Sequence, residues 1–298
     1  MRRNRWFVAV AGVALLMGAI RLGAQSLSSP SPTSPLPVPA ATAPSAQGTR
    51  ANASAPANAS APQQASTPAQ ASTPAKASAP QQDSYEVARE KQLKRDWPWL
   101  DHFAEENKRL PQPAAGEDRV VFMGDSITDF WKLDQSFPGK PYINRGISGQ
   151  TSPQMVLRFR QDVIDLKPRV VVILAGTNDI AGNTGIMTLE QTEGNWKDMA
   201  ELAQANGIRV VLCSVLPAFD FPWKPGLMPA PKIGTLNAWM RAYAAEHGFV
   251  YVDYHSAMKD SRDGLPANLS ADGVHPSPAG YAVMAPLAEA GIRKALSQ

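Results

Sequence analysis

The 298-residue chain contains a single cysteine, Cys213, so it cannot form a disulfide bond within itself. It has no His-Glu-x-x-His sequence and no paired-cysteine pattern, so neither a metal site nor a cofactor is expected. Residues 1–82 contain neither Asp nor Glu. Six of the 29 basic residues lie in that segment, which leaves 23 basic against 26 acidic residues in the rest of the chain. The positive net charge therefore comes from the N-terminal segment, and nucleic-acid binding is not predicted.

The N-terminal segment divides into two parts of different composition. Residues 1–25 open with the basic run Met1–Arg5, and the apolar stretch Trp6–Ile20 that follows is shorter than the about 20 residues a membrane-spanning helix needs. This pattern predicts a signal peptide or, if it is not cleaved, an N-terminal membrane anchor. Residues 26–82 are rich in Ala, Pro, Ser and Thr and are predicted to form a disordered linker. We therefore expect an exported protein, periplasmic or extracellular.

Residues 83–298 have the patterns of folded structure. Residues 83–117 predict a helical lead-in, broken near Pro98, that packs on a domain formed by residues 118–298. Strands and helices alternate in that domain, which is typical of α/β proteins whose parallel sheet is covered on both faces. The predicted strands are 119–123, 141–144, 169–174, 208–213 and 249–252. The predicted helices are 153–165, 188–205, 231–246 and 278–296.

The first strand of this domain leads directly into the sequence Gly-Asp-Ser-Ile-Thr at 124–128. A serine at the carboxyl edge of a parallel strand lies where ligands bind in open α/β sheets, but its hydroxyl needs a base to become a nucleophile. Asp-Gly-Val-His at 272–275 supplies an imidazole and a carboxylate three residues apart. Either segment alone could be an ordinary turn or a helix cap. Together they predict a serine hydrolase that cleaves esters.

Two further polar segments follow apolar runs in the same way. Gly149 belongs to Ile-Ser-Gly-Gln-Thr at 147–151, where a glycine permits close approach of a backbone amide to a substrate. Asn178 follows the aliphatic run 170–174, and its side-chain amide can donate a hydrogen bond to a developing oxyanion. Each segment could equally be a strand-to-helix turn.

These four segments, in this order, resemble the SGNH hydrolases, also called GDSL esterases and lipases. The resemblance covers about residues 118–298 and implies a flavodoxin-like three-layer sandwich with a five-stranded parallel sheet. It implies Ser126 as the nucleophile, His275 as the base and Asp272 as the acid that orients it. It also implies an oxyanion hole formed by the backbone amides of Ser126 and Gly149 and the side chain of Asn178.

The aromatic residues near the predicted active edge are candidates for substrate binding. Trp131, Phe221 and Trp223 could form a platform for an acyl group or a sugar, although the loop 216–229 could equally pack on itself. We expect a secreted serine esterase that hydrolyses short-chain acyl esters, including O-acetyl groups on carbohydrates, through an acyl-enzyme. Two alternatives remain open, an acyltransferase that uses the same serine and a catalytically silent surface binding module. The sequence does not indicate an oligomeric state.

Overall fold

The structure of the protein is a computed structural model that describes residues 80–298, with side chains from Val87 onward. The predicted signal peptide or anchor lies outside the described residues, and so does the predicted linker except for residues 80–82, which begin the first helix. In the part of the chain that is described, no helix is both long enough and apolar enough to cross a membrane.

The centre of the fold is a five-stranded parallel sheet with the order β2-β1-β3-β4-β5, which is the flavodoxin-like order implied by the family resemblance. The strands are β1 (Val120–Gly124), β2 (Tyr142–Gly146), β3 (Val170–Leu174), β4 (Arg209–Cys213) and β5 (Val250–Val252). Each begins one residue after its predicted start. The register sets Gly124 beside Gly146 on one side and Leu174 on the other, so β1, β2 and β3 end at a common edge.

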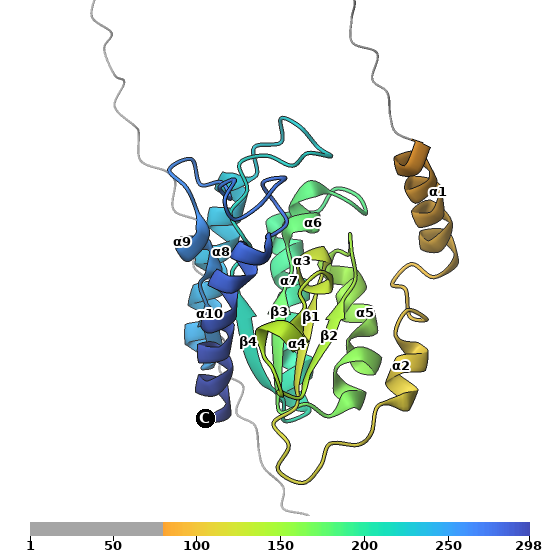
Figure 1. The fold of residues 1–298 in the computed structure, drawn as a ribbon, viewed down its shortest axis with the longest axis vertical. Helices are drawn as coiled ribbons and strands as arrows, with labels where there is room; N and C mark the ends of the chain where they lie inside the picture. The colour runs from red at the N-terminus through yellow and green to blue at the C-terminus, as the bar shows by residue number, and fades with distance from the viewer. Residues whose placement is uncertain (1–79) are drawn as a thin grey trace, which may run out of the picture. The chain divides into compact units, whose positions relative to one another are not determined.

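Helices cover both faces of the sheet, with α5 and α10 on either side of it in Figure 1. Alternate residues of each strand enter different cores, because successive side chains of a strand point to opposite faces. Val120 and Phe122 of β1 pack in the core formed with α10, while Val121 and Met123 pack in the core formed with α5, α7 and α8. Both faces are therefore buried, which explains the uninterrupted apolar runs that predicted the strands.

The long helices match the sequence prediction. They are α5 (Ser152–Asp162), α7 (Leu189–Ala205), α8 (Ala230–His247) and α10 (Pro278–Leu296), and α5 is followed by the 3₁₀ turn η1 (Ile164–Leu166). Four short helices were not predicted, namely α3 (Ser126–Asp129), α4 (Leu133–Ser136), α6 (Thr177–Ala181) and α9 (Tyr254–Met258). Elements of one turn contain too few residues to show a helical period.

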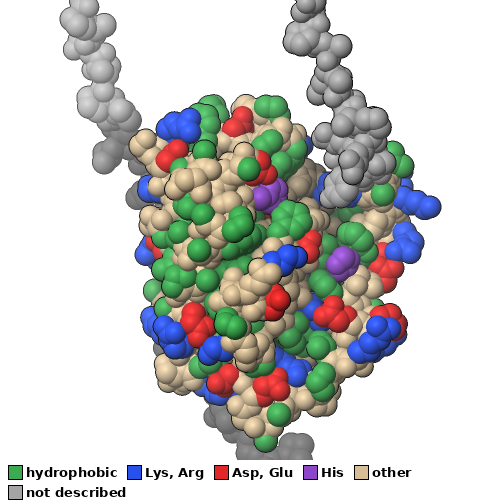
Figure 2. Space-filling model, viewed as in Figure 1, with side chains coloured by type: hydrophobic (Ala, Val, Ile, Leu, Met, Phe, Trp, Pro, Cys, Tyr) green, Lys and Arg blue, Asp and Glu red, His purple; other side chains and the backbone are tan. Residues whose placement is uncertain are grey.

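The lead-in consists of α1 (Pro80–Arg95), a turn that contains Pro98, and α2 (Ala104–Arg109). Hydrogen bonds between polar groups join the lead-in to α5. Asn107 donates to the Asp162 carboxylate at 2.7 Å, and Gln161 donates to the Leu100 carbonyl at 2.6 Å. In Figure 1 the lead-in runs alongside α5. Figure 2 shows acidic and basic side chains interspersed over the visible face, as expected from the nearly balanced charge of this part of the chain.

Arg158 of α5 joins the carboxyl ends of β1 and β2 from inside the protein, where its side chain is fully buried. Its guanidinium donates to the carbonyls of Gly124 at 3.1 Å and Arg145 at 2.9 Å, and it pairs with the buried Asp162 carboxylate at 3.1 Å. Burial lowers the pKa of Arg158 to about 10, so the side chain stays charged at neutral pH. The buried charge of Arg158 therefore stabilises the edge of the sheet that carries Ser126.

We predict that Arg158→Met lowers the free energy of unfolding by about 3–5 kcal/mol, because it leaves the buried Asp162 carboxylate without its counter-charge. Urea denaturation followed by circular dichroism measures this change. Arg160→Met is the matched control on the same helix, since that side chain is exposed, and it should change stability by less than about 0.5 kcal/mol. Equal unfolding midpoints for the two variants would contradict the role assigned to Arg158.

Candidate active site

Ser126 stands directly beyond the end of β1 and begins α3. The Asp125 side chain caps this helix by accepting a hydrogen bond from the Ile127 amide at 3.0 Å. Glycine is required at two neighbouring positions, because α3 lies very close to the sheet. A Cβ on Gly124 would lie 2.8 Å from the Thr128 Cβ of α3, and one on Gly146 would lie 2.1 Å from the Asp129 backbone nitrogen of the same helix. The close packing of α3 thus fixes the position of the Ser126 hydroxyl at the carboxyl edge of the sheet.

The loop 270–276 brings His275 and Asp272 to Ser126, 149 residues away from the histidine in sequence. The Ser126 Oγ lies 2.9 Å from His275 Nε2, and His275 Nδ1 lies 2.6 Å from Asp272 Oδ2. The other Asp272 oxygen accepts hydrogen bonds from the backbone amides of Val274 and His275 at 2.9 and 2.8 Å. This turn fixes the carboxylate against the imidazole. It requires a φ of +78° at Gly273, which glycine adopts without strain.

The Asp272 carboxylate is held in its charged form. Partial burial raises the pKa of this carboxyl group. The hydrogen bonds from the His275 side chain and from two backbone amides lower the pKa by more than burial raises it, and the result is about 2. A charged carboxylate at Nδ1 places the proton of a neutral imidazole on that nitrogen and leaves Nε2 free to accept one from Ser126.

Gly149 and Asn178 lie with Ser126 and His275 in one cleft of about 250 Å³. Gly149 has a φ of +77°, which glycine adopts without strain. The Asn178 Nδ2 donates to the Gln150 carbonyl at 3.0 Å and to Asp125 Oδ2 at 3.3 Å, and its Oδ1 accepts from Asn183 at 2.6 Å. The structure therefore brings together the five residues that the sequence singled out for the triad and the oxyanion hole: Ser126, Gly149, Asn178, Asp272 and His275.

The aromatic candidates fall in three different environments. Trp223 lines the cleft, and its ring centroid lies 6.2 Å from that of His275. Phe221 is fully buried and stacks beneath Trp223 at 5.1 Å, so it supports that side chain rather than facing the cleft. Trp131 is 3% exposed and packs in the core against Phe122 and Tyr281. The expectation that Trp131 faces the substrate is corrected here, since its ring is buried on the α10 side of the sheet.

Four residues of the cleft were missed by the sequence analysis, among them Ser148, whose hydroxyl donates to the Asp129 carboxylate at 2.6 Å. Phe130 lies four residues after Ser126, one helical turn further on, and its ring centroid is 5.5 Å from that of His275. That spacing was a usable signal. Asn183 donates to Asn178 and accepts from the Trp223 indole at 3.1 Å. Arg89 comes from the lead-in helix α1, and nothing in the sequence around it indicates the site.

Two further carboxylates lie buried behind the cleft. Burial raises the pKa of Asp125 to about 7, and burial also raises the pKa of Asp179, although the backbone amide of Ser152 donates to it at 3.1 Å. Within residues 80–298, no group of three or more His, Cys, Asp or Glu side chains is arranged to hold a metal ion.

A serine, a histidine and an aspartate in hydrogen-bond contact at the carboxyl edge of a parallel sheet are typical of serine hydrolases. The family model described as GDSL-like Lipase/Acylhydrolase matches residues 122–283. The chain therefore belongs to the GDSL-like lipase/acylhydrolase family, which confirms the SGNH resemblance, and it is a carboxylic ester hydrolase.

Solved structures and a curated relative agree with this assignment. The crystal structure of a GDSL-like lipase from Bacteroides thetaiotaomicron is 47% identical, with a TM-score of 0.65, and the match covers 67% of this chain and 100% of that one. A candidate acylhydrolase from Bacteroides fragilis is 48% identical, with a TM-score of 0.65, over 67% of this chain and 98% of that one. An acetylxylan esterase of Xylanibacter ruminicola is 28% identical over 225 residues, which are 62% of this chain and only 45% of that protein.

The raised pKa of Asp125 gives a testable dependence of stability on pH. The carboxyl group has a pKa of 3.8 ordinarily and about 7 in the folded protein, so the folded protein keeps a proton that the unfolded chain releases between these values. The wild-type protein should therefore lose stability at this site as the pH rises from about 4 to 7, whereas Asp125→Asn should not. Urea denaturation at several pH values measures the difference between the two proteins. That difference should grow up to about pH 7 and then level off, and a constant difference from pH 4 to 8 would contradict the prediction.

Proposed function

We propose that the protein is a serine esterase that hydrolyses short-chain acyl esters, including O-acetyl groups on carbohydrates, through a Ser126–His275–Asp272 triad and an acyl-enzyme. The observation that carries this proposal is the continuous contact from the Ser126 hydroxyl through the imidazole to Asp272, at 2.9 and 2.6 Å. Both distances lie within hydrogen-bond range, so a proton can move along the first contact while the second holds the imidazole in place.

In this mechanism the Ser126 Oγ attacks the ester carbonyl carbon while His275 Nε2 accepts the hydroxyl proton. The carbonyl oxygen becomes an oxyanion, which the backbone amides of Ser126 and Gly149 and the Asn178 Nδ2 stabilise. For Asn178 this means exchanging its 3.3 Å contact with Asp125 for one with the oxyanion, while the 3.0 Å contact with the Gln150 carbonyl stays. His275 then gives its proton to the departing alcohol, and a water molecule releases the acyl group by the reverse steps.

The size and lining of the cleft support a small ester as the substrate. Its volume of about 250 Å³ holds a short acyl group together with part of the alcohol. Phe130 and Trp223 flank the His275 ring, so the departing alcohol leaves between two aromatic side chains. Such faces suit a sugar ring, and the name of the acetylxylan esterase relative supports an acetylated carbohydrate.

We also propose the domain organisation and the location that the sequence predicted. Residues 83–117 form a lead-in to a hydrolase domain over residues 118–298, and residues 1–25 direct export or anchor the protein. The basic run Met1–Arg5 before an apolar stretch supports export. N-terminal sequencing of the mature protein tests this, since a mature chain that begins at Met1 in the cytoplasm would contradict export.

We predict that Ser126→Ala and His275→Ala each lower kcat on an aryl acetate by about 10⁵-fold or more, because each removes a step of the proton transfer. Asp272→Asn should cost as much or less, since some base function survives imperfect orientation of the imidazole. A fluorophosphonate probe followed by peptide mapping should label the wild-type protein at Ser126 alone.

Ser256→Ala is a matched control for this experiment. Ser256 is exposed, follows His255 in the sequence and donates its hydroxyl to the Asp253 carboxylate at 2.8 Å. It lies outside the cleft. Its replacement should leave kcat unchanged. Probe labelling at another serine, or substantial activity in His275→Ala, would contradict the triad. A panel of acetylated sugars and aryl esters of increasing acyl length tests the proposed substrate class in the same assay.

A further inference from the structure

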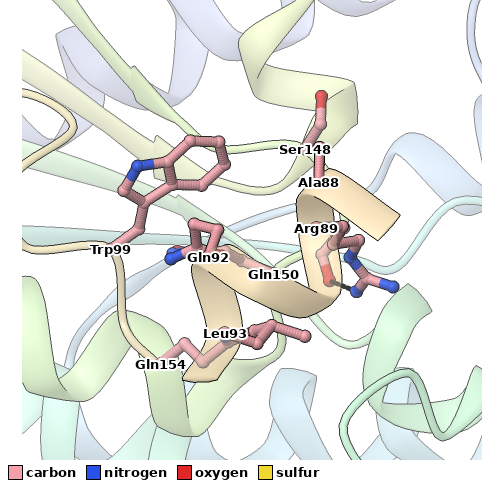
Figure 3. A pocket seen from close by; sticks show the side chains of 9 residues that line it. Ala88, Arg89, Gln92, Leu93, Trp99, Ser148, Gln150 and Gln154 are labelled. Atoms are coloured by element: carbon pink, nitrogen blue, oxygen red, sulfur yellow. Dashed lines mark hydrogen bonds between the residues drawn. The ribbon is translucent and has the colours of Figure 1, made fainter. Parts of the chain in front are cut away.

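A second cavity of about 230 Å³ lies between α1 and the segment Ser148–Gln154, next to the catalytic cleft. Figure 3 shows Trp99 on one side of it and the Arg89 guanidinium on the opposite side, with Leu93 and Gln154 below. Arg89, Ser148 and Gly149 line both this cavity and the catalytic cleft. The two spaces are therefore neighbours that share one wall.

The second cavity presents apolar groups to an occupant, although three glutamines line it. The amide nitrogen of Gln150 donates to the Pro98 carbonyl at 2.8 Å, and that of Gln154 donates to the Trp97 carbonyl at 2.6 Å. The third amide, that of Gln92, donates to the Asp96 carbonyl. With these groups engaged, the aliphatic parts of the glutamines and the side chains of Leu93 and Trp99 remain for contact. Such a surface suits a hydrocarbon chain and offers little to a polar group.

Arg89 is the movable part of the shared wall. Its Nη2 donates to the Gly149 carbonyl at 3.0 Å. Its guanidinium also covers the Gly149 Cα, because a Cβ built there would lie 3.1–3.3 Å from three guanidinium atoms. The other shared lining residues, Ser148 and Gly149, belong to the edge of the sheet, whereas Arg89 reaches in from α1 with a long, flexible side chain.

The position of His275 decides which half of an ester meets this wall. The alcohol oxygen must lie near His275 Nε2, which protonates it, and this side of the cleft is flanked by Phe130 and Trp223. The acyl group is the remaining substituent of the carbonyl carbon, and it points away from the histidine. Of the other residues that line the cleft, Ser148, Gly149 and Arg89 also line the second cavity, so an acyl chain that extends beyond the cleft meets this shared wall before the cavity.

We propose that Arg89 sets the acyl-chain specificity of the enzyme by closing the catalytic cleft against the apolar cavity beneath α1. This inference rests on the proposed Ser126 mechanism. An acetyl group fits in front of the guanidinium, whereas a longer chain must displace Arg89 from the Gly149 carbonyl before it can enter the cavity. Because a water molecule occupies about 30 Å³ in the liquid and a methylene group is of similar size, the cavity has room for several carbon atoms.

The test is the ratio of kcat/KM for 4-nitrophenyl hexanoate to that for 4-nitrophenyl acetate, measured on the full chain. In Arg89→Ala this ratio should rise about tenfold or more, since a few buried methylene groups then contribute to transition-state binding. Leu93→Trp added to Arg89→Ala fills the cavity and should reverse the gain. Lys91→Ala removes a positive charge from an exposed position on the same helix and should leave the ratio unchanged.

Arg89→Met separates the volume of the side chain from its hydrogen bond. This variant retains most of the wall but cannot donate to the Gly149 carbonyl, so its ratio should stay nearer to that of the wild type than the ratio of Arg89→Ala does. A fall of equal size on both esters in Arg89→Ala and Arg89→Met would overturn the proposal and leave Arg89 as a residue that only positions Gly149. Failure of the proposed mechanism has a different signature, namely activity that persists in Ser126→Ala.

Discussion

The buried guanidinium of Arg158 is the interaction on which the arrangement of the site depends. It binds the carbonyls that end β1 and β2, and it donates to the Gln150 side chain at 2.6 Å. The Gln150 carbonyl in turn accepts the Asn178 amide. One charged group of α5 therefore links the strand that carries Ser126, the segment that contains Gly149 and the asparagine after β3. Its burial costs free energy, which the ion pair with Asp162 and the three other hydrogen bonds of the guanidinium offset only in this geometry.

The same network extends outward to the lead-in. The side-chain amides of Gln150 and Gln154 donate to the carbonyls of Pro98 and Trp97. In the other direction, Arg89 of α1 donates to the Gly149 carbonyl. The segment around Gly149 is thus bonded from the sheet side and from the lead-in side. A helix that precedes the family-matched residues 122–283 therefore contributes a wall to the catalytic cleft, so a residue outside the matched region can influence specificity.

The sequence predicted the sheet well because each strand is buried on both faces and is therefore apolar throughout. It also indicated that Ser126, Gly149 and Asn178 lie at one edge of the sheet, since each stands a few residues beyond the end of such a strand. Long-range packing was not accessible in the same way. Trp131 and Phe221 stand near the site in sequence, but their rings turn into the core, and no local pattern distinguishes them from Trp223. Arg89 reaches the cleft only because α1 folds back against the segment around Gly149, a contact that spans 60 residues.

Two aspartates close to His275 show how the surroundings of a carboxyl group decide its chemical use. Asp125 is fully buried, and burial raises its pKa to about 7, so near neutral pH it exists partly as the neutral acid. Asp272 accepts hydrogen bonds from the imidazole and from two backbone amides, which hold its pKa at about 2 despite partial burial. In the proposed mechanism His275 becomes positively charged when it takes the serine proton, and only a carboxylate that is already charged can stabilise that imidazolium. The turn at 272–275 therefore does more than bring an acid near the histidine, because its backbone amides help to hold the pKa of Asp272 at about 2 and so keep that carboxylate ionised at neutral pH.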